Sequence, residues 1–300
     1  MTKNSSTLAL GLLLILALIW GSSFILIKKG LTALSSEEVA CLRIFSAFVV
    51  LLPFAISNLK AVEKSQWKYL LSIGLAGSLI PAFLFAIAQT RLESALVGIM
   101  NTLTPLFTIL IARVIYGHTQ ARRVYLGVAL GFIGSIFLIS GGNGSGIVSF
   151  NPYSLLIVLA TIFYATNLNI IKEHLQGLKA LPITSISLFI VGPIAGIYLF
   201  SMTNFPDKLH NIEEMILPIA YIVILGVVGT SLALIIFNHI VRLTNPLFTS
   251  SVTYIIPIVA LMWGLWDGER LVIFHYIGMV LVIAGVYLAN RPKKSNVEKA

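Results

Sequence analysis

The sequence contains little charge and almost no cysteine. Only 10% of its 300 residues are charged, whereas 58% are hydrophobic and the mean hydropathy is +0.97. An ordinary soluble domain has about 25% charged residues, so the composition excludes that class. Cys41 is the single cysteine, which excludes an intrachain disulfide. The chain is therefore predicted to be an integral membrane protein without disulfide cross-links.

Motifs of enzymes and nucleotide sites are also missing. An intramembrane enzyme needs a paired base and nucleophile or a metal cluster at membrane depth. The chain has no His-Glu-x-x-His, no Gly-x-Ser-x-Gly in an apolar stretch and no aspartate pair. We predict no catalytic residue, metal or cofactor, and keep an intramembrane enzyme only as an alternative. The glycine-rich stretch 141–146 lacks the Lys-Ser/Thr of a phosphate-binding loop, so we interpret it as a flexible linker.

Long apolar stretches are what the chain has in abundance. A transmembrane helix needs about 20 mostly apolar residues, and continuous rather than alternating hydrophobicity favours helices over a barrel. The first stretch is too long for a signal peptide and no cleavage site follows it, so we retain it as a helix. The fold class is therefore all-α, and we predict ten transmembrane helices: Leu8–Ile27, Val39–Ile56, Tyr69–Gln89, Ser94–Ile115, Val124–Ser140, Tyr153–Ile171, Leu181–Met202, Ile216–Asn238, Leu247–Trp266 and Val272–Asn290.

The same five-helix pattern occurs twice in the chain. Pro105 corresponds to Pro257 and Gly117 to Gly268, at offsets of 152 and 151 residues. Because five is odd, the second copy must cross the membrane in the opposite orientation. Inverted repeats of this kind build alternating-access transporters. We predict two inverted five-helix repeats, residues 1–145 and 146–300, the second with a short basic tail.

The positive charges behind the formal net charge of +9 are distributed along the chain in agreement with the predicted topology. With the N-terminus inside, cytoplasmic segments hold all of the 20 Lys and Arg residues except Lys28, Lys29, Arg43, Arg91, Lys208 and Arg270. The positive-inside rule then places both termini in the cytoplasm. The excess charge therefore sets orientation, and we predict no nucleic-acid partner.

Four short motifs resemble the EamA family of the drug/metabolite transporter superfamily. The resemblance covers about Leu8 to Asn290. The motifs are Trp20-Gly21-Ser22-Ser23-Phe24 followed by Lys28, Leu42-Arg43-Ile44, Thr104-Pro105-Leu106-Phe107, and Gly268-Glu269-Arg270-Leu271 before the Gly278–Gly285 helix. The resemblance implies a multi-pass permease of the cell (inner) membrane, not an enzyme, that moves small metabolites, often amino acids or related compounds and often outward. It further implies a central cavity lined by the first, third, fourth, sixth, eighth and ninth helices.

The chain departs from the family pattern in its first copy of one motif and in its sixth helix. Gly268-Glu269 becomes Gly117-His118 in the first repeat, and Trp-Gly-Ser-Ser becomes Phe163-Tyr164-Ala165-Thr166. These differences argue against a mechanism that needs two symmetric acids.

Two other transporter types of this superfamily stay open as alternatives. Multidrug proton antiporters that resemble it use a carboxylate deep in the membrane, but all 11 acidic residues here lie in predicted loops or at helix ends. A nucleotide-sugar or phosphate-ester carrier needs buried cations, and only Arg43 is near such depth. We expect Arg43 itself to be structural, either reaching the interface or pairing with Glu37, Glu38 or Glu93.

Uncharged polar side chains in the predicted helices are the substrate-binding candidates. Helical spacing puts Asn101 and Thr104 on one face. A mid-membrane amide such as Asn101 or Asn167 has four hydrogen-bonding sites to satisfy. Each candidate has an alternative role in joining helices, through hydrogen bonds worth about 0.6 kcal/mol. The candidates are Trp20, Ser23, Gln89, Asn101, Thr104, Tyr164, Asn167, Asn238, Thr253 and Tyr254.

Prolines, glycines and one histidine raise further alternatives. Pro105 and Pro257 are hinge candidates, although packing kinks are equally compatible with them. The glycines of the predicted fifth and tenth helices let helices approach closely, either within a monomer or in a homodimer. His239 is predicted to be an interfacial hydrogen-bonded residue rather than a titrating gate. The expected partners are a small-molecule substrate and the lipid bilayer.

Overall fold

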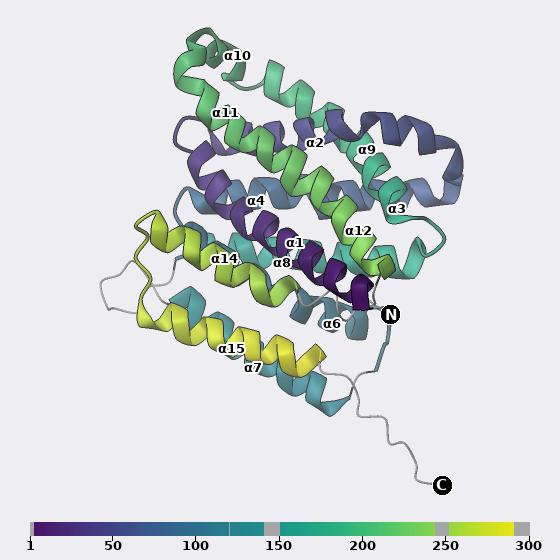
Figure 1. Ribbon diagram of the computed structural model, residues 1–300, viewed down its shortest axis with the longest axis vertical. Helices are drawn as coiled ribbons and strands as arrows, with labels where there is room; N and C mark the ends of the chain where they lie inside the picture. Colours follow the sequence, from purple (N-terminus) through teal and green to yellow (C-terminus); the bar gives the residue numbers. More distant parts are fainter. Residues whose placement is uncertain (1–2, 120, 141–150, 244–251, 291–300) are drawn as a thin grey trace.

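The computed structural model describes residues 3–119, 121–140, 151–243 and 252–290, apart from a few side chains within these ranges. The described residues form helices and no strand (Figure 1), as apolar segments in lipid require because every backbone group must find its partner within the chain. The α-helices are α1 Lys3–Gly30, α2 Ser36–Asn58, α3 Trp67–Gly74, α4 Ile80–Gln89, α5 Ser94–Met100, α6 Thr104–Val114, α7 Arg122–Ser140, α8 Tyr153–His174, α9 Ala180–Ser201, α10 Phe205–Lys208, α11 Ile212–Gly226, α12 Ala233–Leu243, α14 Val252–Trp266 and α15 Ile273–Asn290.

Short segments of other helix types interrupt this series. Four are 3₁₀ turns: η1 Leu59–Ala61, η2 Lys64–Gln66, η4 Asn101–Leu103 and η5 Leu209–Asn211. The other two, η3 Leu75–Leu79 and η6 Val227–Leu232, are π-helical. η3 joins α3 to α4, and η6 joins α11 to α12, so each pair of α-helices forms one continuous helical rod.

Seven stretches of the described residues are long and apolar enough to cross a membrane. They are Leu10–Gly30, Ser36–Ala61, Lys64–Gln89, Ser94–Val114, Tyr153–His174, Ala180–Ser201 and Phe205–Phe237. Two shorter apolar helices, Ile255–Trp266 and Ile273–Ala289, accompany them. The prediction of an all-helical membrane protein is confirmed, whereas the ten-helix count and the side that holds the termini stay predictions. The predicted linker 141–146 lies outside the described residues.

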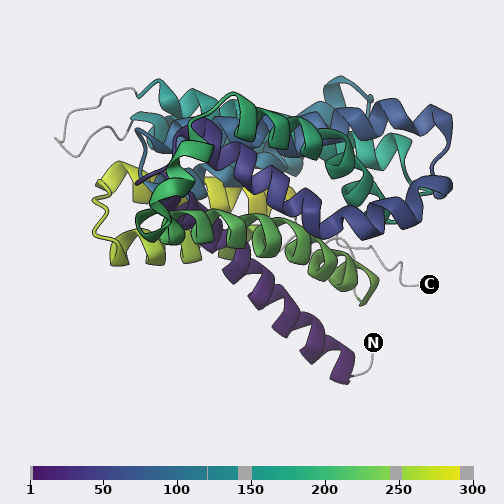
Figure 2. The ribbon, with the colours of Figure 1, turned by 90° about the horizontal axis from the view of Figure 1, so that it is seen from above.

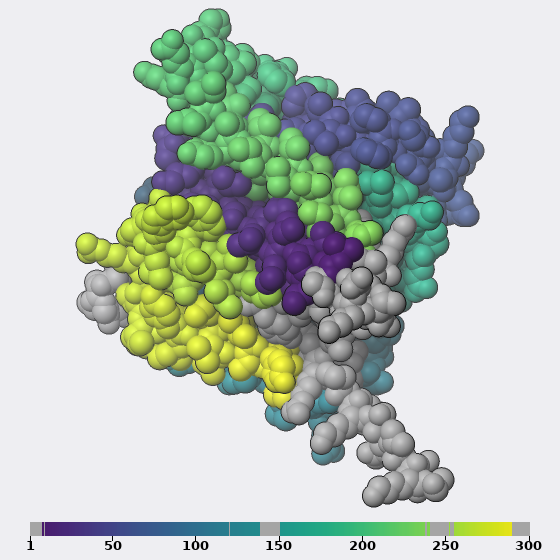
Figure 3. Space-filling view, viewed as in Figure 1, coloured from purple at the N-terminus to yellow at the C-terminus, as the bar shows by residue number. Residues whose placement is uncertain are grey.

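Helix α1 carries exposed apolar residues along its first half. Leu8, Leu10, Leu14 and Leu18 are each about half exposed. In Figure 2 this part of α1 projects beyond the neighbouring helices, and in Figure 3 it lies on the surface beside α12. An apolar surface of this kind is suited to contact with lipid rather than water.

Helix α1 and its counterpart α8 each pack mainly against helices of the other half, and they run in opposite directions. Helix α1 packs against α14, α11 and α12, while α8 packs against α6, α3 and α4. Lys28, near the end of α1, and Ser154, at the start of α8, line the same cavity. We call this end of the helix bundle the Lys28 end. Helix α1 therefore ends where its counterpart α8 begins.

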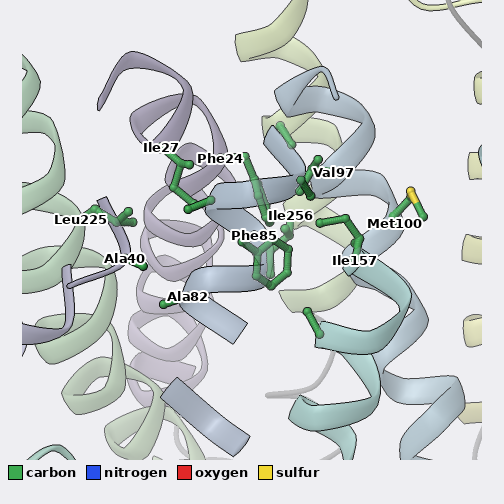
Figure 4. Close-up of a cluster of buried hydrophobic side chains, with 14 of the residues drawn as sticks. Phe24, Ile27, Ala40, Ala82, Phe85, Val97, Met100, Ile157, Leu225 and Ile256 are labelled. Carbon is green, nitrogen blue, oxygen red and sulfur yellow. The ribbon is translucent and has the colours of Figure 1, made fainter. Parts of the chain in front are cut away.

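The centre of the bundle is apolar and draws on both halves. Phe24 of α1 and Phe85 of α4 have ring centroids 5.9 Å apart, and Ile256 of α14 and Ile157 of α8 lie beside them (Figure 4). Phe24, Phe85 and Ile157 are each at most 6% exposed. This apolar core contains residues of both halves and joins them.

Glycines bring α7 and α15 together along one edge of the bundle, where Figure 1 shows the two helices side by side. A Cβ on Gly127 would lie 2.5 Å from the carbonyl oxygen of Gly285, and a Cβ on Gly285 would lie 2.5 Å from that of Gly127. Gly134 and Gly278 approach each other in the same manner, at 2.8 Å. These glycine faces are therefore occupied within a single chain.

Replacing Gly285 by alanine should destabilise the protein. The new methyl group would overlap the α7 backbone, and overpacking of this type costs about 1–3 kcal/mol. Gly11→Ala is the matched control, because a Cβ there meets nothing within 4 Å and alanine is the better helix former. Thermal unfolding of detergent-solubilised protein should show a lower midpoint for Gly285→Ala and an unchanged or higher one for Gly11→Ala. Equal midpoints for the two variants would contradict the close contact.

Candidate functional site

The two π-helical segments occupy corresponding places in the two halves. Gly77 lies in η3 and Gly229 in η6, and 229 minus 77 gives the offset of 152 found between the prolines. A π segment widens the helix by one residue per turn and is frequent at functional sites. These segments were not predicted from the sequence. In each half, a helix of the other half approaches the glycine.

Helix α1 contacts η6 through Trp20 and Ser23. The indole Nε1 of Trp20 donates a hydrogen bond to the carbonyl oxygen of Gly229 at 3.1 Å. A Cβ on Gly229 would lie 3.3 Å from the Oγ of Ser23, and that hydroxyl donates to the carbonyl of Ile19 at 3.2 Å. Both residues therefore already have hydrogen-bond partners within the protein.

Helix α8 contacts η3 through Asn167 in the corresponding way. A Cβ on Gly77 would lie 2.7 Å from the Cγ of Asn167, so only glycine leaves room for this amide. The Oδ1 of Asn167 is buried and has no hydrogen-bond partner. One turn earlier, the ring of Tyr164 stacks on Phe85 with centroids 5.8 Å apart. Unlike Ser23, Asn167 thus presents an unsatisfied acceptor.

Arg43 forms no salt bridge among the described residues, and the structural role expected for it stays a prediction. Of the three carboxylates considered for it, Glu38 pairs with Lys208 at 2.6 Å and Glu93 with Lys28 at 3.2 Å. The Arg43 guanidinium interacts electrostatically with Tyr164, in the other half of the molecule. Its Nε is buried without a hydrogen-bond partner. Arg43 belongs to α2, and both α2 and α8 contact η3.

The predicted fourth helix breaks at its polar residues. Asn101 begins the 3₁₀ turn η4, and Thr104 begins α6, its Oγ1 donating to the carbonyl of Asn101 at 2.9 Å. Pro105 stands in the first turn of α6, where a missing backbone N–H is tolerated. The Oδ1 of Asn101 is buried without a partner. Since η4 and α6 pack against α8, Asn101 is on an element that borders the helix of Asn167.

The remaining candidates lie away from η3 and η6, or their side chains are outside the described residues. Gln89 is at the Lys28 end, in a cavity separate from η3 and η6. Pro257 is inside α14, and His239 is exposed near the end of α12. The side chains of Asn238, Thr253 and Tyr254 lie outside the described residues. The predicted set is therefore divided between two regions rather than gathered in one.

An ion-pair cluster joins the two halves at the Lys28 end. The Nζ of Lys28 lies 2.8 Å from Glu269 Oε1, 2.9 Å from Asp267 Oδ2 and 3.2 Å from Glu93 Oε2. Lys29 adds a second contact to Asp267, at 2.5 Å. Asp267 and Glu269 follow α14, whereas Glu93 precedes α5. We call these five residues the Lys28 cluster.

The side chain of Glu269 is fully buried and is held by backbone as well as side chains. Its Oε1 accepts from the backbone N–H of Ser94 at 2.9 Å and from the Ser94 hydroxyl at 2.5 Å, and its Oε2 accepts from the N–H of Ala95 at 2.9 Å. It thus satisfies the free N–H groups at the start of α5, where negative charge is favoured. Gly268, with a φ of +79°, provides the turn that directs Glu269 inward.

Both carboxylates after α14 are stabilised in their charged form. Burial raises the pKa of Glu269, but hydrogen bonds from Lys28, Ser94 and Ala95 outweigh it and hold that pKa below its ordinary value. Hydrogen bonds from Lys28 and Lys29 likewise lower the pKa of Asp267. Asp267 and Glu269 therefore stay charged at neutral pH.

The corresponding turn of the first repeat has different chemistry. Gly117 has a φ of +71°, but the next residue is His118, whose Nε2 lies 3.7 Å from Glu173 Oε1 of α8. The ring of Tyr116 is 6.3 Å from that of His118 and 6.1 Å from that of His174. A glycine with positive φ forms the turn in both repeats. Among the described residues, several ion pairs surround the turn at Gly268, whereas one His118–Glu173 contact lies beside the turn at Gly117.

A helical membrane bundle of two related halves, with polar groups enclosed between them, is the form of a multi-pass transport protein. The EamA-like transporter family model matches residues 7–140 and 151–291, so the chain belongs to that family. The resemblance seen in the sequence is confirmed, and the family consists of membrane transporters rather than enzymes.

Individual relatives span nearly the whole chain. The uncharacterized inner membrane transporter YedA of Escherichia coli K12 is 25% identical over 94% of this chain and 90% of its own. A probable amino-acid metabolite efflux pump of the same organism is 23% identical over 96% and 95%. A solved crystal structure aligns with a TM-score of 0.62 at 13% identity, covering 94% of this chain and 96% of the other. This last similarity concerns the fold alone.

Acid should remove the stability that Glu269 contributes. A carboxyl group whose pKa is lower in the folded protein than in the unfolded protein stabilises the fold at pH values above its unfolded-state pKa. That stabilisation is lost as the pH falls through its folded-state pKa. The unfolded-state pKa of a glutamate is about 4.3. Wild type should therefore unfold at a higher temperature than Glu269→Gln at pH 7, and the gap should shrink below about pH 4.3.

Thermal unfolding of both proteins between pH 7 and pH 3.5 measures this gap. Glu214→Gln, at an exposed position, is the matched control and should follow wild type throughout. A gap that does not change with pH would show that the Glu269 charge is not what stabilises the fold.

Proposed function

We propose that the protein is an inner-membrane transporter that exports a small metabolite of the amino-acid class by alternating access. In this proposal, ten membrane-spanning helices form two inverted repeats, 1–145 and 146–300. Both termini lie on the cytoplasmic side, and the Lys28 end faces outward. The names of the relatives support the class of activity and of substrate. The opposite directions of α1 and α8 at the Lys28 end support the inverted repeat.

The substrate site is proposed where α2 and α8 meet η3. The observation that carries this proposal is a pair of buried polar atoms without partners, the Oδ1 of Asn167 and the Nε of Arg43, on two helices that both contact η3. Tyr164, one turn from Asn167, interacts electrostatically with Arg43. A buried polar group left unpaired is costly, and a bound metabolite would satisfy both. Arg43 would take the carboxylate of the substrate, while Asn167 would accept a hydrogen bond from its amino group.

The Lys28 cluster serves as the closure of the outer end. It connects the end of α1 to α5 and to the segment after α14 through three carboxylates on one ammonium group. Substrate release to the outside requires these contacts to separate, while the opposite end closes. Pro105 next to η4 and Pro257 within α14 are the proposed hinges, since proline weakens a helix at the residues before it.

The basic test is efflux without nucleotide. Proteoliposomes loaded with a mixture of amino acids and their metabolites should lose at least one compound faster than protein-free vesicles, with no ATP present. Mass spectrometry of both compartments identifies the compound. Retention of every compound at the protein-free rate would refute the proposed export.

Removing the Asn167 amide should weaken substrate binding before it affects folding. Loss of one buried hydrogen bond costs about 0.5–1.5 kcal/mol, which corresponds to an increase in KM of about two- to tenfold. Asn58→Ala is the matched control, because the Asn58 side chain donates within its own helix, to the carbonyl of Phe54. Efflux kinetics should show a raised KM for Asn167→Ala and an unchanged KM for Asn58→Ala. An unchanged KM in both variants would remove Asn167 from the site.

Neutralising Lys28 should open the Lys28 end. In a Cys41→Ala background, Leu96→Cys places a thiol at a buried position beside the cluster, 6% exposed. Adding Lys28→Met leaves three carboxylates without their shared cation, so their repulsion should separate the helix ends. A membrane-impermeant maleimide should then label the introduced thiol at least several times faster. Equal labelling rates with and without Lys28→Met would contradict the closing role of the cluster.

A further inference from the structure

A cavity of about 620 Å³ lies at the Lys28 end, away from η3 and η6. The ends of α4 and α7 and the starts of α5, α8 and α15 surround it. Its volume falls within the range of about 300–1,000 Å³ found for small-molecule sites. The substrate site proposed above does not include it.

Three of its lining side chains are polar and deeply buried, and each has at least one polar atom without a hydrogen-bond partner. Gln89 is 6% exposed, Ser154 1% and His275 4%. Neither amide atom of Gln89, nor the Oγ of Ser154, nor the Nε2 of His275 has a hydrogen-bond partner. These residues come from α4, α8 and α15, yet all three line one space.

The donor and acceptor roles of these groups can be assigned. The Nδ1 of His275 accepts from the backbone N–H of Val272 at 3.4 Å, so the neutral ring carries its proton on Nε2 and offers a donor to the cavity. The Gln89 amide offers two donors and an acceptor oxygen, and the Ser154 hydroxyl can donate one hydrogen bond and accept others. The buried part of the cavity therefore offers both donors and acceptors to a ligand.

Arginines at the rim give the cavity its charge. Arg91 and Arg270 line it and are exposed, and within the described ranges neither forms a salt bridge. Lys28 and Glu93 also line it, but each belongs to the Lys28 cluster and compensates the other. The uncompensated charge is thus positive, from two guanidinium groups suited to planar carboxylates.

We propose that this cavity is a binding site for a small carboxylate that also carries a hydroxyl or amide group. The carboxylate lies between the rim arginines, and the second polar group reaches Gln89, Ser154 and His275. The site stands independently of the proposed export, because it rests on residues that the proposed substrate site does not use.

Binding of L-malate to the purified full-length protein tests the proposal, with its uncharged diamide as the matched ligand and sodium chloride to equalise ionic strength. L-Malate should raise the unfolding midpoint of wild type in a saturable manner, and the diamide should not. Arg270→Gln and Gln89→Leu should each weaken the apparent affinity at least tenfold. Asn167→Ala should retain wild-type affinity.

The outcomes separate this site from the substrate site. Loss of the malate effect in Asn167→Ala, with Arg270→Gln unaffected, would place the ligand near η3 and overturn the proposal. Equal stabilisation by the diamide, or no saturable effect of malate on wild type, would also overturn it. Ligand-free midpoints identify any variant that is misfolded, and Arg91→Gln then replaces Arg270→Gln. Failure of nucleotide-free efflux would refute the transport proposal and leave this binding result intact.

Discussion

The contact between Lys28 and the carboxylates of the opposite half is the interaction on which the organisation of one end depends. Removing charges from water is costly, and their mutual attraction offsets that cost only when further hydrogen bonds satisfy the remaining lone pairs. Glu269 meets this condition, because the N–H groups that start α5 donate to its carboxylate together with Lys28. A single carboxylate thus caps one helix of the first repeat and anchors a segment of the second. The position of α5, and with it the rim of the neighbouring cavity, follows from this contact.

Close backbone approach organises the rest of the bundle. Lipid gives little hydrophobic drive for helices to associate, so van der Waals packing and interhelical hydrogen bonds take that role. Gly127 and Gly285 bring α7 and α15 into backbone contact, and Gly77 and Gly229 let α8 and α1 reach the π segments. In the first case the result is a tight pair of helices. In the second, the space left by the missing Cβ is filled by a polar side chain from the other half.

The architecture was predictable from the sequence because it depends on features that a sequence displays directly. Apolar length specified the helices, and the equivalent prolines and glycines specified the repeat. Gly268-Glu269 and Lys28 were noticed as family motifs, but nothing in their spacing showed that they meet. The π segments do not follow from the sequence, because both lie within continuous apolar stretches, which predict a helix without showing its type. The surroundings of Arg43 do not follow from its sequence neighbours, because Tyr164, with which it interacts, lies in the other repeat, while Glu93 and Glu38 pair with Lys28 and Lys208.

The two glycine turns carry different residues on both sides of the glycine, Tyr116 and His118 against Asp267 and Glu269. Under the proposed mechanism this difference would affect the resting state of the protein. Near Gly268 several ion pairs hold that end of the bundle, whereas after Gly117 the equivalent position is an imidazole 3.7 Å from Glu173, charged only when protonated. Under the proposed mechanism, opening the two ends would therefore have unequal free energies. About 1.4 kcal/mol of such a difference shifts the ratio of the two conformations tenfold. Under the proposed alternating access, the empty molecule would therefore wait mostly in one conformation, with the Lys28 end shut, and the rates of transport in the two directions would differ.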